Sequence, residues 1–119
     1  MADLLLVDDD TDQLELRRLL LERSGNSVRT ATGPETALSL ARERPPAVAI
    51  MDLRLPGLQD GLSLIRQLSE LPVRIIVLSG WPADLENTPE RPLVFRLFSK
   101  PVNLRVLLDA VREAYEFRV

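Results

Sequence analysis

The sequence predicts an α/β domain in which helices cover both faces of a parallel sheet. Five short apolar segments alternate along the chain with about five longer amphipathic segments. This alternation is typical of repeated strand–helix units, and nearly continuous apolar strands are typical of a sheet buried on both faces. A length of 119 residues fits one domain with a sizeable core. We therefore predict a single doubly wound (βα)5 domain over residues 1–119.

Three strands and two helices are predicted in the first half of the chain. The apolar segments span residues 4–7, 28–31 and 47–51, and an amphipathic segment spans residues 11–24. Ser24-Gly25-Asn26 ends this first helix with residues typical of a helix C-terminus. Pro34 suits the first position of the second helix, and Pro45-Pro46 ends it.

Two further strands are predicted in the second half of the chain. The elements in order are a turn at Pro56-Gly57, a helix over 60–69, and strands over 73–78 and 93–98. Only a short fourth helix fits among three closely spaced prolines, which are Pro82, Pro89 and Pro92. The last helix begins after its expected N-cap, Asn103, and has a buried stripe at helical spacing, formed by Leu104, Leu107, Leu108 and Val111.

Composition excludes several classes of chemistry. The chain has no cysteine and no histidine, which excludes disulfides, thiolate and histidine-ligated zinc sites, and Ser-His-Asp catalysis. The chain cannot serve as a histidine phosphodonor either. Carboxylates, hydroxyls and a single amine remain, because the 15 basic residues are 14 arginines and one lysine.

Charge and hydropathy argue against nucleic acids and membranes as partners. The chain has 18 acidic and 15 basic residues, so a basic face for nucleic acid is not expected. The apolar run at residues 4–7 is too short for a signal peptide, and no window approaches the roughly 18 apolar residues of a membrane span. We expect a cytoplasmic protein with no direct nucleic-acid binding and no membrane contact.

Reactive side chains follow four of the five predicted strands. They are Asp8, Asp9 and Asp10 after the first strand, Asp52 after the third, Ser79 after the fourth and Lys100 after the fifth. Because ligands bind beyond the carboxyl ends of parallel strands, we expect these side chains to converge there. Clustered carboxylates need a cation, and oxygen ligands favour Mg²⁺. A carboxylate beside Mg²⁺ can attack phosphorus and form an aspartyl phosphate.

Each of these residues taken alone has a simpler explanation. A run of aspartates is commonly a helix N-terminal charge cluster, and an aspartate or serine after a strand is commonly a turn residue. Their placement at one end of the predicted sheet favours a shared site. The single lysine of an arginine-rich chain also falls there, and an ammonium is a compact charge that fits beside a phosphoryl group.

With these residues in this order, the sequence resembles the receiver domain of two-component response regulators. The matching motifs cover essentially the whole chain and are Leu6-Val7-Asp8-Asp9-Asp10, the segment from Met51 to Gly57, Leu78-Ser79-Gly80 and Ser99-Lys100-Pro101-Val102. The resemblance implies a flavodoxin-like sheet in the order 2-1-3-4-5. It also implies phosphoryl transfer from the phosphohistidine of a partner sensor kinase or phosphotransfer protein to this chain, and a downstream protein target or output domain that reads the result.

The resemblance implies a role for each site residue. Asp52 is the expected phosphoacceptor, and Ser79 and Lys100 are expected to bind phosphoryl oxygens. A cis peptide bond is expected before Pro101. The expected Mg²⁺ ligands are Asp8, Asp9, Asp52 and the backbone carbonyl of Arg54.

The sequence departs from the family pattern near the face formed by the fourth helix, fifth strand and fifth helix. Leu97 stands where the family usually has an aromatic switch residue, and it is flanked by Phe95 and by Phe98, which we expect to face the core. We expect intact phosphorylation chemistry with an altered readout, and a weak homodimer at most. The resemblance implies that the side chains two positions after the acceptor and two after the hydroxyl residue border the path of attacking water. Here they are Arg54 and Trp81, whose size predicts slow dephosphorylation unless Trp81 packs under the proline-rich loop.

Two alternatives are open at this point. A phosphatase with an aspartyl nucleophile needs an acidic residue two positions later, where this chain has Arg54. A phosphorylation-independent interaction module is favoured by the departures above. It is opposed by the presence of four site residues, which are Asp9, Asp52, Ser79 and Lys100. We expect a receiver that catalyses only its own phosphorylation and dephosphorylation and is not a conventional enzyme.

Overall fold

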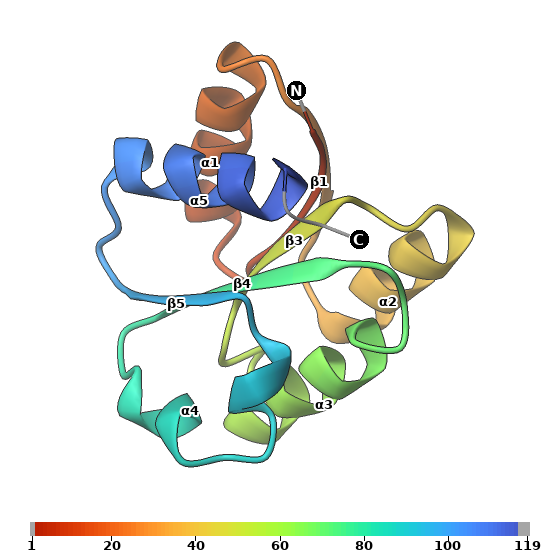
Figure 1. Ribbon diagram of the computed structural model, residues 1–119, viewed down its shortest axis with the longest axis vertical. Helices are drawn as coiled ribbons and strands as arrows, with labels where there is room; N and C mark the ends of the chain where they lie inside the picture. The colour runs from red at the N-terminus through yellow and green to blue at the C-terminus, as the bar shows by residue number, and fades with distance from the viewer. Residues whose placement is uncertain (1, 117–119) are drawn as a thin grey trace.

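The computed structural model describes residues 2–116, which form a five-stranded parallel sheet between two layers of helices (Figure 1). The strands are β1 (Asp3–Val7), β2 (Ser27–Ala31), β3 (Val48–Asp52), β4 (Arg74–Ser79) and β5 (Arg96–Ser99). Their order in the sheet is β2-β1-β3-β4-β5, and every neighbouring pair is parallel. Both the fold class and the strand order are therefore confirmed.

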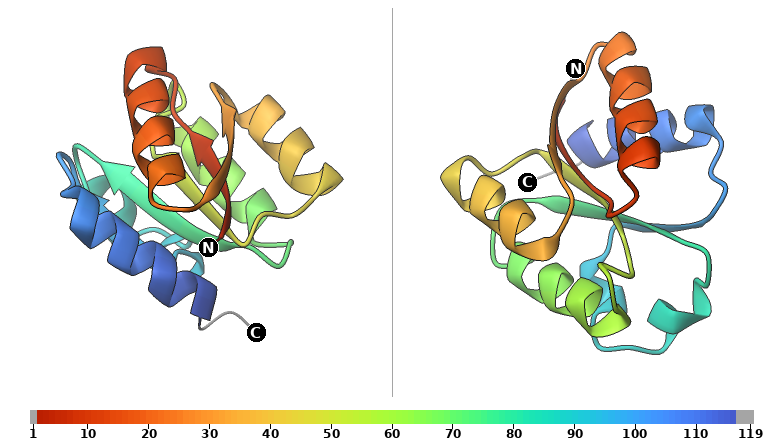
Figure 2. Two further views of the ribbon diagram at one scale, coloured as in Figure 1. Left: turned by 90° about the horizontal axis from the view of Figure 1, so that it is seen from above. Right: turned by 180° about the vertical axis from the view of Figure 1, so that it is seen from behind.

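Helices lie on both faces of the sheet, as Figures 1 and 2 show. One face carries α1 (Thr11–Arg23) and α5 (Leu104–Glu116), and the other carries α2 (Pro34–Glu43) and α3 (Leu58–Leu68). The expected short fourth helix is α4 (Ala83–Glu86), which is followed by a 3-10 turn at Arg91–Leu93. Within residues 2–116, no helix has the length and apolar character needed to cross a membrane.

Alternating residues of each strand supply two separate cores. Leu5 and Val7 of β1 pack with α2 and α3, whereas Leu4 and Leu6 pack with α1 and α5. All four side chains are at most 1% exposed. A strand with a core on each side has no polar face, which explains its uninterrupted apolar sequence.

Characteristic residues define several of the helix ends. The Asn103 side chain accepts hydrogen bonds from the backbone N–H groups of Arg105 (2.8 Å) and Val106 (3.4 Å), which confirms it as the N-cap of α5. Pro34 occupies the first turn of α2 as predicted. Gly25 follows α1 with φ of 94°, a left-handed conformation that favours glycine.

The fifth strand is shorter than the sequence predicted. The prediction spanned residues 93–98, but β5 pairs with β4 only from Arg96 to Ser99. Pro92 has no N–H to donate to a neighbouring strand, and it lies instead in the 3-10 turn. The turn leaves Leu93 at 42% exposure rather than in the sheet.

The three candidate switch residues face different surroundings. Leu97 packs against the core of α2 and α3, and Phe98 packs against the core of α1 and α5, as expected for Phe98. Two guanidinium groups lie over the Phe95 ring, with Arg96 at 4.4 Å and Arg74 at 5.2 Å from the ring centre. None of these packing positions assigns the switch role.

The strand register brings the carboxyl ends of the central strands together. Val7 is paired with Met51, and Asp52 is paired with Leu78, one residue before Ser79. Ser79 is paired with Ser99. The residues that directly follow β1 and β5 therefore lie at the same edge as the last residues of β3 and β4.

Candidate functional site

Three carboxylates meet at the carboxyl end of the sheet, as the sequence predicted. Asp8 and Asp9 follow β1, Asp52 ends β3, and one carboxylate oxygen from each lies within 4.8 Å of the other two. Asp8 is 1% exposed, whereas Asp9 is exposed and Asp52 is half-buried. The cluster therefore has a buried base and a side that faces solvent.

Asp10 has a different role from its two neighbours. Its Oδ1 accepts hydrogen bonds from the backbone N–H groups of Asp12 (3.1 Å) and Gln13 (3.2 Å), so it caps α1. Its own backbone N–H donates to Asp8 Oδ1 at 2.9 Å. The helix-capping explanation of the aspartate run thus applies to Asp10, and the cluster explanation applies to Asp8 and Asp9.

Lys100 reaches into the carboxylate cluster from the opposite side of the edge. Its Nζ lies 2.9 Å from Asp52 Oδ2 and 4.0 Å from Asp8 Oδ2. Its backbone N–H donates to the Ser79 carbonyl at 2.8 Å, which anchors the segment after β5 to β4. The peptide bond between Lys100 and Pro101 is cis, as expected.

Ser79 lies at the end of β4 and is 4% exposed. Its Oγ accepts a hydrogen bond from the backbone N–H of Trp81 at 3.0 Å. The hydroxyl hydrogen remains available to an oxygen ligand, because accepting this bond uses only a lone pair.

The Arg54 side chain is paired with α4, and the Trp81 side chain is exposed. Arg54 Nη2 donates to Asp84 Oδ2 of α4 at 2.7 Å, which links the loop after β3 to α4. Trp81 is 70% exposed, so the alternative that it packs under the proline-rich loop is wrong. Slow dephosphorylation stays a prediction.

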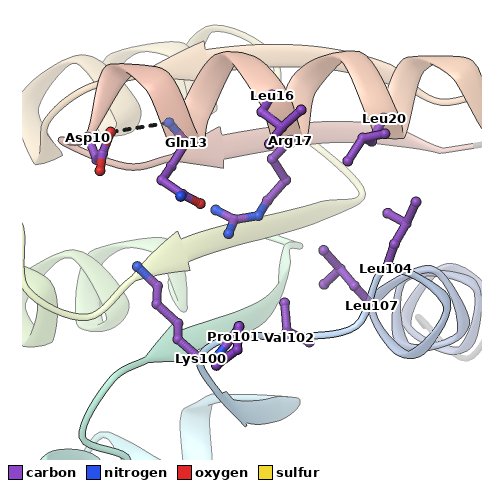
Figure 3. Close-up of a pocket in the computed structure, with 10 residues that line it drawn as sticks. All are labelled: Asp10, Gln13, Leu16, Arg17, Leu20, Lys100, Pro101, Val102, Leu104 and Leu107. Atoms are coloured by element: carbon purple, nitrogen blue, oxygen red, sulfur yellow. Dashed lines mark hydrogen bonds between the residues drawn. The ribbon is translucent and has the colours of Figure 1, made fainter.

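Arg17 of α1 is a further member of the cluster, and the sequence did not predict it. Its Nη1 lies 3.3 Å from Asp8 Oδ2, and its side chain is only 15% exposed. A signal was available, because Arg17 stands three residues after buried Leu14 and four before buried Leu21, on the inward stripe of the helix. Arg17 and Lys100 also line an open groove of about 470 Å³ between α1 and the start of α5 (Figure 3).

The electrostatics of the cluster favour a bound cation. Burial raises the pKa of the Asp52 carboxyl, the hydrogen bond and positive charge of Lys100 lower it in part, and the charges of Asp8 and Asp9 raise it further. Burial and carboxylate repulsion together outweigh the attraction of Lys100. Carboxylate oxygens are hard donors, so this donor set fits Mg²⁺.

We expect Asp52→Asn to stabilise the protein at pH 7 in Mg²⁺-free buffer by about 1 kcal/mol, or roughly 4 °C. The pKa of Asp52 is raised in the folded state, so ionisation of this group costs stability at any pH above its folded pKa. The advantage of Asn should therefore shrink as the pH falls through the folded pKa, and vanish below the unfolded pKa, where Asp52 is protonated in both states. Thermal unfolding followed by circular dichroism across this pH range measures the effect.

Asp109→Asn is the matched control for this prediction. Asp109 is exposed and has only a 3.6 Å contact with Arg112 on the same helix. We expect the same change of charge at this exposed position to have little effect on the thermal midpoint at pH 7. An Asp52→Asn variant less stable than wild type at pH 7 would mean that the Lys100 ion pair outweighs burial.

Known proteins share both the sequence pattern and the fold of this chain. Residues 4–112 match the family described as "Response regulator receiver domain". The chain is 34% identical over 121 residues to the C4-dicarboxylate transport transcriptional regulatory protein DctD of Pseudomonas aeruginosa, covering 98% of this chain and 26% of DctD. It is 31% identical over 117 residues to Protein PilH of the same organism, covering 93% of this chain and 95% of PilH.

A solved structure with the same architecture is the response regulator receiver domain protein from Clostridium thermocellum. The two superpose with a TM-score of 0.87 at 26% sequence identity, covering 98% of this chain and 95% of that chain. The chain spans about half the length of other curated relatives, including the transcriptional regulatory protein AfsQ1 of Streptomyces coelicolor, of which it covers 50%.

Proposed function

Because the chain belongs to the response regulator receiver domain family, we propose that it accepts a phosphoryl group on Asp52 and signals through a conformational change. The observation that carries this proposal is the Lys100 ammonium, 2.9 Å from Asp52 Oδ2 at the edge of a three-carboxylate cluster. Phosphoryl transfer to an aspartate needs a nucleophilic oxygen that is held beside groups able to offset the negative charge of the transferred phosphate. The arrangement of Asp52 and Lys100 supplies both.

In the proposed reaction, an Asp52 carboxylate oxygen attacks the phosphorus of the donor. A phosphorus–oxygen bond to Asp52 forms while the bond from phosphorus to the donor histidine nitrogen breaks, and the electron pair of that bond stays on the nitrogen. Lys100 Nζ offsets the charge of the transferred oxygens. The Ser79 hydroxyl donates its hydrogen to a phosphoryl oxygen while its Oγ still accepts from the Trp81 N–H.

We propose that the carboxylates of Asp8, Asp9 and Asp52 and the backbone carbonyl of Arg54 hold Mg²⁺. When bound, the ion offsets the negative charge of the carboxylates and of the phosphoryl oxygens during transfer. The buried position of Asp8 and the exposed position of Asp9 support this assignment, because they give the ion a rigid ligand and an entry side.

The receiver family implies a histidine kinase as the phosphoryl source. We propose that a sensor histidine kinase or a phosphotransfer protein donates to Asp52, and that a downstream protein or an output domain reads the phosphorylated state. DctD is named as a transcriptional regulatory protein, but the shared region is 26% of that protein. We propose no direct nucleic-acid binding by this domain, in line with its net charge of -3.

Acetyl phosphate provides a direct test. We expect wild-type protein incubated with Mg²⁺ and acetyl phosphate to gain one phosphoryl group, measured by intact mass spectrometry. Asp52→Asn should show no adduct, because the amide cannot act as the nucleophile, and chelation of Mg²⁺ should also prevent the adduct. Asp109→Asn is a control with the same change of charge outside the site, and it should be phosphorylated like wild type.

An adduct that persists in Asp52→Asn would show that the acceptor is another residue. No adduct on wild type, together with no binding of Mg²⁺-beryllofluoride, would instead support a phosphorylation-independent interaction module that keeps the receiver fold.

A further inference from the structure

Arg17 places a second cation inside the carboxylate cluster. Arginine side chains on a helix usually face solvent, but the Arg17 side chain is only 15% exposed. Its Nη1 lies 3.3 Å from Asp8 Oδ2. Figure 3 shows the Arg17 and Lys100 side chains extending toward one opening from α1 and from the segment after β5. Arg17 is therefore part of the site and not part of the charged surface of α1.

Both oxygens of Asp8 are already engaged by the protein. Oδ1 accepts the backbone N–H of Asp10 at 2.9 Å. Oδ2 has Arg17 Nη1 at 3.3 Å and Lys100 Nζ at 4.0 Å. A divalent cation bound among Asp8, Asp9 and Asp52 must therefore share Asp8 Oδ2 with the Arg17 guanidinium or displace it.

Charge makes this sharing unfavourable. The three carboxylates and Lys100 together carry two negative charges, and Arg17 reduces that sum to one. Arginine keeps its positive charge at any physiological pH, so the reduction is permanent. Two cations held a few ångströms apart repel strongly in a partly buried site, where water screens them poorly.

We propose that Arg17 is a resident counter-ion of Asp8 that weakens Mg²⁺ binding by this domain. The proposal rests on the proposed function, because it concerns the same metal site. Arg17 is a positioning residue here, since it acts on the metal through Asp8. The alternative role is that Arg17 orients Asp8 so that it can bind the metal. In that case, removing Arg17 would weaken Mg²⁺ binding.

The test is a Mg²⁺ titration of Arg17→Gln beside Arg18→Gln at constant ionic strength. Arg18 is the next residue of the same helix and pairs with Glu15 and Glu22 on the exposed face, so its loss removes one positive charge without touching Asp8. Emission of the single tryptophan, Trp81, and the Mg²⁺-dependent rise in the thermal midpoint give two independent readouts. Phosphorylation activity is not needed for either.

We expect Arg17→Gln to bind Mg²⁺ about tenfold more tightly than wild type, which corresponds to about 1.4 kcal/mol. Arg18→Gln should stay within about twofold of wild type. Arg17→Lys retains the charge and should remain closer to wild type than to Arg17→Gln. If Arg17→Gln fails to fold, Arg17→Leu carries the test, because leucine continues the buried stripe of Leu14 and Leu21.

Equal Mg²⁺ affinity of the Arg17→Gln and Arg18→Gln variants would overturn the proposal, and so would weaker binding by Arg17→Gln than by wild type. If wild type binds Mg²⁺ and the Arg17 variants bind it equally well, only the role of Arg17 is wrong. If neither wild type nor any variant binds Mg²⁺, the proposed metal-dependent function is wrong as well.

Discussion

Gly61→Ala is expected to destabilise the protein by about 3 kcal/mol or more, although alanine is intrinsically the better helix former by about 1 kcal/mol. Gly61 lies in the first turn of α3, directly against the chain that follows β3. A Cβ added there would lie 1.5 Å from the carbonyl oxygen and 2.6 Å from the carbonyl carbon of Leu53. These are backbone atoms, so no side-chain rotation removes the clash.

The clash would also disturb the site, because Leu53 is next to Asp52 in the chain. Leu53 is 1% exposed, so moving its carbonyl shifts the loop beside the proposed phosphoacceptor. We therefore expect any folded Gly61→Ala protein to be phosphorylated more slowly by acetyl phosphate than wild type. Chemical denaturation followed by far-ultraviolet circular dichroism measures the loss of stability.

Gly33→Ala is the control for this experiment. A Cβ added at Gly33 meets no atom within 4 Å, and the residue has an extended φ of -157° at the N-cap of α2. We expect it to cost only about 1 kcal/mol, because alanine is a poorer N-cap residue than glycine but meets no clash here. A Gly61→Ala variant as stable as Gly33→Ala would mean that α3 can move away from Leu53 without cost.

The second large effect is expected from Lys100→Met, which should destabilise the domain by about 2–3 kcal/mol at pH 7 without Mg²⁺. Lys100 Nζ is 2.9 Å from Asp52 Oδ2, and the Asp52 side chain is 17% exposed. Methionine keeps the apolar stem but leaves the clustered carboxylates without this ammonium. Because burial already raises the pKa of Asp52, the loss of Lys100 should raise that pKa further.

A double-mutant cycle with Asp52→Asn isolates the interaction between the two side chains. In the Asp52→Asn background, Lys100→Met should lower the free energy of unfolding much less than it does in wild type. The difference gives a coupling free energy of about 2 kcal/mol. Arg112→Met is the control, since Arg112 is 64% exposed and lies 3.6 Å from Asp109. A coupling near zero would show that solvent screens Lys100 from Asp52, and it would weaken the proposed role of Lys100 at the phosphoryl group.

The sequence alone determined the fold class and most of the residues that meet at the carboxyl edge of the sheet. The alternation of short apolar and longer amphipathic segments predicted five strands and their helices, because strands buried on both faces lack polar positions. The location of Asp8, Asp9 and Asp52 followed from topology, since residues after parallel strands must lie at one edge. The same reasoning placed Lys100, whose ammonium lies 2.9 Å from Asp52.

Only the tertiary structure decided how neighbouring residues divide their roles. Asp9 and Asp10 look alike in the sequence, but Asp10 turns toward the N-H groups of α1 while Asp9 joins the cluster. The β5 boundary was predicted three residues early, because an apolar residue such as Leu93 satisfies a strand pattern even where Pro92 prevents pairing.

Arg17 and Gly61 are the clearest examples of contacts that only the tertiary structure decided. Periodicity indicates which face of a helix is buried, but it does not say which atom of another element lies opposite. The Arg17 contact with Asp8 and the approach of Gly61 to the Leu53 carbonyl depend on how α1 and α3 dock on the sheet. Docking is determined by packing across the whole domain, so these two contacts became visible only in the folded chain.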